Sequence, residues 1–229
     1  MRYIVFTDLD GTLLDINTYS FSKAKKALSL IKKKKIPLIF CTSKNKLENK
    51  LYQKKIGIKY PFIAENGAVI FMPKKTIVLG TNVKRLRKLL KEIEKEAKAK
   101  IIGFGDMTVK QIAKDCGLPL KEAILAKKRE YTEPFKIIKG NINLIKKLIK
   151  KHRLNYTKSA RYHYIMGKND KGKAVKKLIR YYRKKYGEIK TIGLGDSLND
   201  KTMLKAVNKG FLIKNGPKEW KKIILRLLI

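Results

Sequence analysis

Two aspartates, Asp8 and Asp10, follow directly on a short apolar run near the start of the chain. That run, Tyr3-Ile4-Val5-Phe6, is typical of a buried strand in a parallel sheet. Open sheets of this kind bind their ligands beyond the carboxyl ends of the strands. The segment therefore predicts an α/β fold, and it places two carboxylates where such a fold has its binding site.

A second predicted strand also ends in acidic residues. Ile192-Gly193-Leu194-Gly195 is followed by Asp196, and Asp200 comes shortly after it. If the two strand ends converge, up to four carboxylates share one pocket. Two unit charges about 4 Å apart repel by about 4 kcal/mol at an effective dielectric constant of about 20, so such a cluster needs a cation. Ligands that are all oxygen favour a hard ion, with Mg²⁺ as the first candidate.

The apolar periodicity predicts a doubly wound, Rossmann-like parallel sheet that is interrupted by an insertion. A helix over 21–35 with Ala24, Ala27, Leu28 and Ile31 on one face leads into a strand over 36–40, and a hairpin turns at Asn66-Gly67. Between 82 and 163 the pattern changes to a long helix, short strands and short helices. We therefore predict a core formed by residues 1–81 and 164–229, and an inserted α+β domain over 82–163.

Basic residues dominate the charge of the chain. Lys and Arg number 57 against 18 Asp and Glu, a formal net charge of +39. This raises the alternative of a basic nucleic-acid-binding protein. The basic residues are, however, spread over nearly every predicted helix face and do not gather in one arm. We interpret them as a lysine-rich solvated surface, which also fits a thermophile, and expect the positive potential to speed capture of an anionic substrate.

The number of cysteines and the hydropathy of the chain indicate in which cellular compartment we expect the protein. Cys41 and Cys116 are too few for a disulfide framework and lack metal-ligand spacing. The first apolar run is too short for the core of a signal peptide, and no stretch approaches the roughly 18 apolar residues that span a bilayer. We expect a soluble, cytoplasmic protein with free thiols.

Four segments in order resemble the motifs of the haloacid dehalogenase superfamily of phosphatases. They are Asp8-Leu9-Asp10-Gly11-Thr12, Thr42 after a strand, Lys171 before a helix, and Gly195-Asp196 with Asn199-Asp200. Each segment alone is weak, whereas the ordered set, which covers residues 8 to 200, is specific. The chain is therefore identified as a member of that superfamily.

The resemblance implies Mg²⁺-dependent hydrolysis of a phosphate monoester through an aspartyl-phosphate. Asp8 is then the nucleophile, and Asp10 is the general acid and base, with its backbone carbonyl on the metal. Thr42 and Lys171 neutralise the phosphoryl oxygens. Asp196 completes the metal shell together with Asp8. Supporting roles fall to Ser197, Asn199 and Asp200, although a capped turn before a helix over 201–207 explains Asn199 and Asp200 as well.

Further strings narrow the resemblance to the Cof-type branch, which carries an α+β cap, and within it to the mannosyl-3-phosphoglycerate phosphatase family. They are Thr42-Ser43-Lys44, Pro61–Gly67, Arg129–Glu133, Ser159–Tyr164 and Lys168–Ala174. This family makes mannosylglycerate, a compatible solute, and the resemblance implies a small anionic phosphorylated glycoside as substrate, with the glucosyl compound as a second one. Lys44 departs from the arginine that is usual in the branch.

Candidate substrate-binding residues follow from these strings and from the anionic groups of such a substrate. Simpler roles remain open, since the two arginines could be surface side chains, residues 65–67 could only form the turn, and Asn169 could only cap a helix. The candidates are Ser43, Lys44, Glu65, Asn66, Gly67, Arg129, Arg161 and Asn169.

Two enzymatic alternatives stay open beside the nucleic-acid-binding one. A broader sugar-phosphate phosphatase of the same superfamily would release phosphate from simpler substrates. A phosphomannomutase-like enzyme would move the phosphoryl group instead of releasing it. The sequence predicts no specific nucleic-acid partner and no membrane partner, and it is compatible with a monomer or a homodimer.

Overall fold

β1 lies inside a parallel sheet with the strand order β11-β10-β1-β2. A computed structural model describes residues 2–159 and 161–228 of the chain. In the strand register, Thr7 at the end of β1 lies opposite Leu194 of β10 and Phe40 of β2. The residues that follow these strands therefore emerge at one edge of the sheet. The strand bounds are β1 Arg2–Thr7, β2 Leu38–Phe40, β10 Ile189–Gly195 and β11 Lys209–Leu212.

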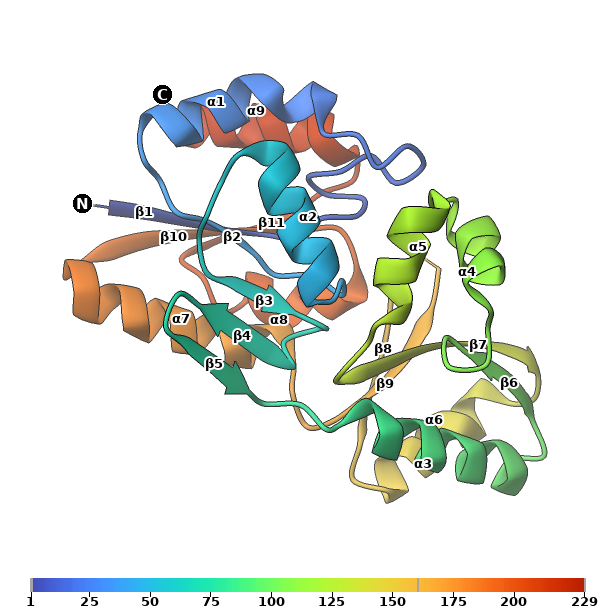
Figure 1. The fold of residues 1–229 in the computed structure, drawn as a ribbon. Helices are drawn as coiled ribbons and strands as arrows, with labels where there is room; N and C mark the ends of the chain where they lie inside the picture. Colours follow the sequence, from blue (N-terminus) through green and yellow to red (C-terminus); the bar gives the residue numbers. More distant parts are fainter. Residues whose placement is uncertain (1, 160, 229) are drawn as a thin grey trace.

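Helices cover both faces of this sheet, as Figure 1 shows. Val5 packs on one side with α1 and α9, whereas Ile4 and Phe6 pack on the other side with α7, which is the alternation expected of a strand. The predicted buried face is confirmed, because Ala27, Leu28 and Ile31 of α1 and Ala24 of the 3-10 turn before it are all buried. The helix bounds are α1 Lys25–Lys33, α7 Lys171–Tyr186, α8 Lys201–Leu204 and α9 Gly216–Leu228.

A small antiparallel sheet extends the core beyond β2. It has the order β3-β4-β5, and a parallel bridge from Cys41 to Ile63 joins it to the end of β2. The predicted hairpin about Asn66-Gly67 is confirmed by the pairing of Ala64 with Val69. β5 was not predicted from the sequence, because its residues are largely exposed and carry no apolar alternation. The bounds are α2 Lys46–Ile56, β3 Phe62–Ala64, β4 Val69–Met72 and β5 Lys75–Val78.

The inserted domain, the cap, is an antiparallel sheet of order β6-β7-β9-β8 that packs with two pairs of helices. One helix pair, α3 and α6, packs with Phe135 and Ile165, and the other, α4 and α5, packs with Phe104 and Tyr162. Figure 1 shows α5 on the side of the cap that faces α2 of the core. The bounds are α3 Val83–Glu96, β6 Lys100–Gly103, α4 Val109–Cys116, α5 Leu120–Lys127, β7 Thr132–Lys139, α6 Ile142–Lys151, β8 Asn155–Lys158 and β9 His163–Met166.

The strand pairing shifts the boundary between cap and core. β9 pairs with β7 and with β8, and both of these are strands of the cap. We therefore propose that the cap extends to Met166 and does not end at residue 163. The predicted helix over 201–207 is shorter than expected, because α8 ends at Leu204.

Both cysteines are free and buried, Cys41 in the core and Cys116 in the cap. Within the described ranges, every helix is too short or too polar to cross a bilayer. The lysines of α1, including Lys25, Lys26 and Lys32, are exposed opposite its buried face, as a solvated surface requires.

The β3–β4 turn makes a steric prediction. Gly67 has φ +84, and a Cβ there would lie 2.1 Å from the carbonyl oxygen of Asp170, next to Lys171. Gly57 also has positive φ, but its Cβ would only meet Lys32 Nζ at 3.8 Å. We expect Gly57→Ala to lower the free energy of unfolding by about 1 kcal/mol. Gly67→Ala should lower it by about 2–4 kcal/mol, since it adds a backbone clash.

Urea denaturation of both variants checks this. Equal losses of stability would contradict the account, because they would mean that backbone conformation alone sets the cost at Gly67.

Candidate active site

A buried lysine joins the ends of the two central strands. Lys171, the first residue of α7, donates from Nζ to Asp8 Oδ1 at 2.9 Å and to Asp200 Oδ1 at 2.6 Å. Its side chain is completely inaccessible to solvent. Asp170 caps the helix by accepting a hydrogen bond from the backbone of Lys173, which fixes where α7 begins. The structure thus brings together Asp8 and Lys171, which lie 163 residues apart in the sequence.

Asp196 and Asp200 complete an acidic cluster with Asp8. Carboxylate oxygens of these three residues lie within 4.8 Å of one another. Asp196 accepts hydrogen bonds from Thr12 Oγ1 at 2.8 Å and from Ser197 Oγ at 2.6 Å. Asp200 accepts from the backbone amides of Asp196 and Ser197. Asp200 therefore braces the loop, as its predicted supporting role requires, and it also contributes an oxygen to the cluster.

The charge balance of the cluster suits a divalent cation. Among the residues that the structure describes, only Lys171 forms an ion pair with these carboxylates, so the group carries excess negative charge when all three are ionised. Burial raises the pKa of Asp196, and the nearby charge of Asp8 adds to that rise. A bound cation would remove this penalty, and an oxygen-only donor set fits Mg²⁺. The cluster contains Asp8 and Asp196, which were predicted as metal ligands from the sequence. It also contains Asp200, which was not.

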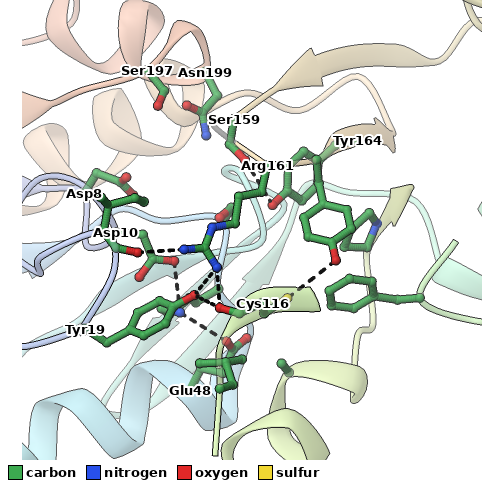
Figure 2. Close-up of a pocket in the computed structure, with 18 of the residues that line it drawn as sticks. Asp8, Asp10, Tyr19, Glu48, Cys116, Ser159, Arg161, Tyr164, Ser197 and Asn199 are labelled. Carbon is green, nitrogen blue, oxygen red and sulfur yellow. Dashed lines mark hydrogen bonds and ion pairs between the residues drawn. The ribbon is translucent and has the colours of Figure 1, made fainter. Parts of the chain in front are cut away.

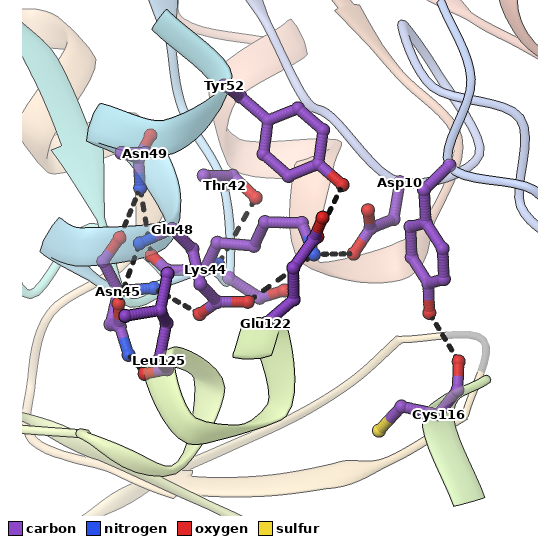
Figure 3. A network of polar contacts seen from close by, with 12 residues as sticks. Asp10, Thr42, Lys44, Asn45, Glu48, Asn49, Tyr52, Cys116, Glu122 and Leu125 are labelled. Atoms are coloured by element: carbon purple, nitrogen blue, oxygen red, sulfur yellow. Dashed lines mark hydrogen bonds and ion pairs between the residues drawn. The ribbon is translucent and has the colours of Figure 1, made fainter. Parts of the chain in front are cut away.

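Asp10 pairs with Lys44 (Figure 3). Lys44 Nζ lies 3.0 Å from Asp10 Oδ2 and 3.4 Å from Glu48 Oε1. Burial raises the pKa of the Asp10 carboxyl, and Lys44 opposes that rise. Asp10 Oδ1 is buried and has no hydrogen-bond partner among the described residues. One oxygen of the Asp10 carboxyl group is thus available to a reacting group.

Thr42 and Ser43 follow β2 at the same edge of the sheet. Thr42 is buried, and its Oγ1 accepts a hydrogen bond from the backbone amide of Lys44 at 3.2 Å. Ser43 lines the pocket described below, and its carbonyl oxygen accepts from Arg129 Nη2 at 2.6 Å. The order of the strands therefore brings the second motif next to the first.

Glu65 is fully engaged with the cap. Its carboxylate accepts hydrogen bonds from the backbone amides of Glu130, Tyr131 and Thr132 at 2.8–3.0 Å and from the Thr132 hydroxyl at 2.9 Å. Arg129, a cap residue, lies 3.7 Å from the Glu65 carboxylate. We propose that this residue pair anchors the cap to the core, in place of the sugar contact predicted for Glu65.

The turn after Glu65 is tied to two other loops of the site. Asn169 Nδ2 donates to the Asn66 carbonyl at 3.1 Å, and Asn199 Nδ2 donates to Asn66 Oδ1 at 3.0 Å. Gly67 allows close approach to the backbone of Asp170. These contacts hold the first turn of α7, and with it Lys171, against the β3–β4 hairpin. A scaffolding role therefore accounts for Asn66, Gly67 and Asn169.

A pocket opens between the acidic cluster and the cap (Figure 2). Asp8, Asp10, Lys44 and Asp196 line it from the core, and the cap adds a largely apolar and aromatic wall with two cations, Arg129 and Arg161. Such a wall beside a few charged groups suits a small polar ligand that carries carbon surface. The cap residues of the lining are Phe104, Cys116, Leu118, Ala126, Arg129, Pro134, Ser159, Arg161, Tyr162 and Tyr164.

Three core residues of this pocket, Ile16, Tyr19 and Glu48, were not predicted from the sequence. Glu48 could have been found from its spacing, because it lies one helical turn after Lys44 and three residues after Asn45. That spacing gives both the ion pair with Lys44 and a capping box with Asn45 at the start of α2. Tyr19 gave no such signal, since it lies in an irregular loop.

Comparisons with known proteins place the chain among hydrolases. A family model described as haloacid dehalogenase-like hydrolase matches residues 5–226. A glucosyl-3-phosphoglycerate/mannosyl-3-phosphoglycerate phosphatase from Methanococcoides burtonii is 47% identical over 93% of this chain and 85% of its own length. A mannosyl-3-phosphoglycerate phosphatase from Pyrococcus furiosus is 35% identical over 93% of this chain and 91% of its own.

Solved structures share the fold. A protein from Thermoplasma acidophilum superposes with a TM-score of 0.73 at 20% identity, over the whole of both chains. A sugar phosphatase of subclass IIB of the same superfamily superposes with a TM-score of 0.70 at 18% identity, also over the whole of both. The predicted combination of a parallel α/β core with an α+β cap is thereby confirmed.

The acidic cluster predicts stabilisation by Mg²⁺. At an ion concentration about 100-fold above Kd, binding should add about 2.7 kcal/mol to the free energy of unfolding. Asp196→Asn should abolish most of this gain, because it removes one ligand and part of the repulsion that the ion offsets. Thermal unfolding with and without Mg²⁺ measures both. Glu92→Gln, on an exposed position of α3, is the charge-matched control and should respond as the wild type does.

An equal response to Mg²⁺ in the wild type and in Asp196→Asn would contradict the assignment of this cluster as the cation site.

Proposed function

The chain belongs to the haloacid dehalogenase-like hydrolases, and from that membership we propose that it hydrolyses mannosyl-3-phosphoglycerate to mannosylglycerate and phosphate, and that it also accepts glucosyl-3-phosphoglycerate. The observation that carries this proposal is the 47% identity to a relative named for both activities. The match covers 93% of this chain and therefore spans both core and cap.

The geometry supports a two-step reaction that begins at Asp8. The free oxygen of the Asp8 carboxylate attacks phosphorus, and the bond between phosphorus and the glycerate oxygen breaks to leave an aspartyl-phosphate. Lys171 Nζ, 2.9 Å from Asp8 Oδ1, is placed to offset negative charge on the phosphoryl oxygens, and the Thr42 hydroxyl is assigned the same task. Mg²⁺, when bound, would supply further charge neutralisation and align the phosphoryl group.

We assign both proton transfers to Asp10. Since burial raises the pKa of its carboxyl, it can donate a proton to the departing glycerate oxygen in the first step. The resulting carboxylate then takes a proton from the water that attacks the aspartyl-phosphate. Lys44, at 3.0 Å, stabilises that carboxylate between the two steps. Both proton transfers thus use Asp10 Oδ1, the carboxyl oxygen that has no hydrogen-bond partner among the described residues.

Phosphate release tests the proposal. The assay compares mannosyl-3-phosphoglycerate with mannose 6-phosphate and 3-phosphoglycerate, in the presence of Mg²⁺. We expect a strong preference for the glycosylated compound. Asp8→Asn should lower kcat by about 10⁴-fold or more, because it removes the nucleophile. Asp106→Asn, the same chemical change in the cap outside the pocket, should retain activity.

Equal or better turnover of mannose 6-phosphate would indicate a broader sugar-phosphate phosphatase. Transfer of the phosphoryl group without release of phosphate would indicate a mutase. Full activity of Asp8→Asn would contradict the mechanism itself.

A further inference from the structure

Arg161 reaches from the cap to the core across the mouth of the pocket. It lies between β8 and β9 and is half-buried. Its Nη2 donates to the carbonyl oxygen of Ile16 at 2.9 Å, and its Nη1 donates to the Tyr19 hydroxyl at 3.2 Å and to the carbonyl oxygen of Cys116. Figure 2 shows its guanidinium group above Tyr19, on the side of the pocket where Asp10 lies.

Arg161 makes its direct contacts to neutral oxygens, although its charge is near enough to help lower the pKa of the Asp115 carboxyl. All three of its acceptors are neutral oxygens, and no carboxylate of a described residue lies within 4.0 Å of it. The other cations of the pocket differ in this respect. Lys44 contacts Asp10 and Glu48, and Arg129 lies 3.6 Å from Glu48. Arg161 is thus the pocket cation, within the described part of the chain, that an incoming anion can neutralise.

Tyr19 holds Arg161 in place. It adopts φ +54, a conformation that non-glycine residues rarely take and that is commonly kept at functional sites. This conformation directs its hydroxyl to the carbonyl oxygen of Cys116 at 2.6 Å, and its ring lies 5.8 Å from the Arg161 guanidinium. Burial raises the pKa of Tyr19 to about 12, so the hydroxyl keeps its proton. A strained core loop therefore serves to orient a cap arginine.

We propose that Arg161, oriented by Tyr19, binds the carboxylate of the substrate while the phosphoryl group lies at Asp8. This inference rests on the proposed function, since a glycosylated phosphoglycerate carries both anions and a simple sugar phosphate carries one. A guanidinium group matches a carboxylate with two parallel N–H donors. The bound carboxylate replaces a neutral oxygen as acceptor, and the contact draws the cap onto the core.

A substrate pair that differs only in the carboxylate tests this directly. One member is mannosyl-3-phosphoglycerate, and the other is its analogue with a hydroxymethyl group in place of the carboxylate. We expect the wild type to favour the first by about 10- to 100-fold in kcat/KM. Arg161→Gln should lose that factor on the carboxylate substrate, and its kcat/KM on the analogue should stay within about 3-fold of the wild type.

Two further variants sharpen the test. Tyr19→Phe keeps the ring and removes the hydroxyl, and it should lose about 3- to 10-fold on the carboxylate substrate alone. Lys158→Gln removes one positive charge from an exposed position of the same hairpin and should leave both rates unchanged. If Arg161→Gln does not fold, as judged by thermal unfolding, Tyr19→Phe carries the test.

Equal losses on both substrates in Arg161→Gln would overturn the inference, because Arg161 would then only hold the cap to the core. A wild type that hydrolyses both substrates equally would overturn it as well, and the phosphatase reaction would stand. A wild type that hydrolyses neither would overturn the proposed function itself.

Discussion

Three carboxylates cannot share a space of 4.8 Å without positive charge, and much of this fold serves to provide it. The parallel pairing of β1 with β10 brings Asp8 close to Asp196 and Asp200, and α7 begins where its first residue, Lys171, can reach between them. The β3–β4 turn packs against Asp170 and fixes that start. One lysine does not neutralise three ionised carboxylates, and a divalent cation at the cluster would neutralise the remaining negative charge.

A second series of charges links the pocket to the cap. It alternates in sign from Asp10 through Lys44, Glu48 and Arg129 to Glu65, with contacts of 3.0–3.7 Å. All of these residues except Asp10 are buried, so removing one member would leave its neighbours as unpaired buried charges. The last member binds the backbone at the start of β7. The position of the cap and the surroundings of the proposed general acid are therefore set by one network.

The sequence predicted those features that depend on residues close together in the chain. Apolar runs that end in aspartates predicted both strand ends, and helical spacing predicted the buried face of α1. Contacts between distant segments left no such signal. The partners of Glu65 are the backbone amides of Glu130, Tyr131 and Thr132, at least 65 positions further along the chain. The sequence could therefore suggest a turn or a sugar contact for Glu65, but not an anchor for the cap. The position of Tyr19 in the pocket depends on a loop conformation, and the formation of β5 depends on its pairing with β4. Neither feature produces an apolar periodicity in the sequence.

The central claim is that Asp8 carries the phosphoryl group between the two steps. Acid quench of Asp10→Asn during turnover of mannosyl-3-phosphoglycerate, followed by mass spectrometry of the peptide that contains Asp8, measures this directly. The account predicts a phosphorylated Asp8 that forms slowly, because the variant lacks the general acid of the first step, and that then persists, because it also lacks the base that activates water for the second step. Phosphate release by this variant at the wild-type rate, with no phosphorylated peptide at any time, would contradict it.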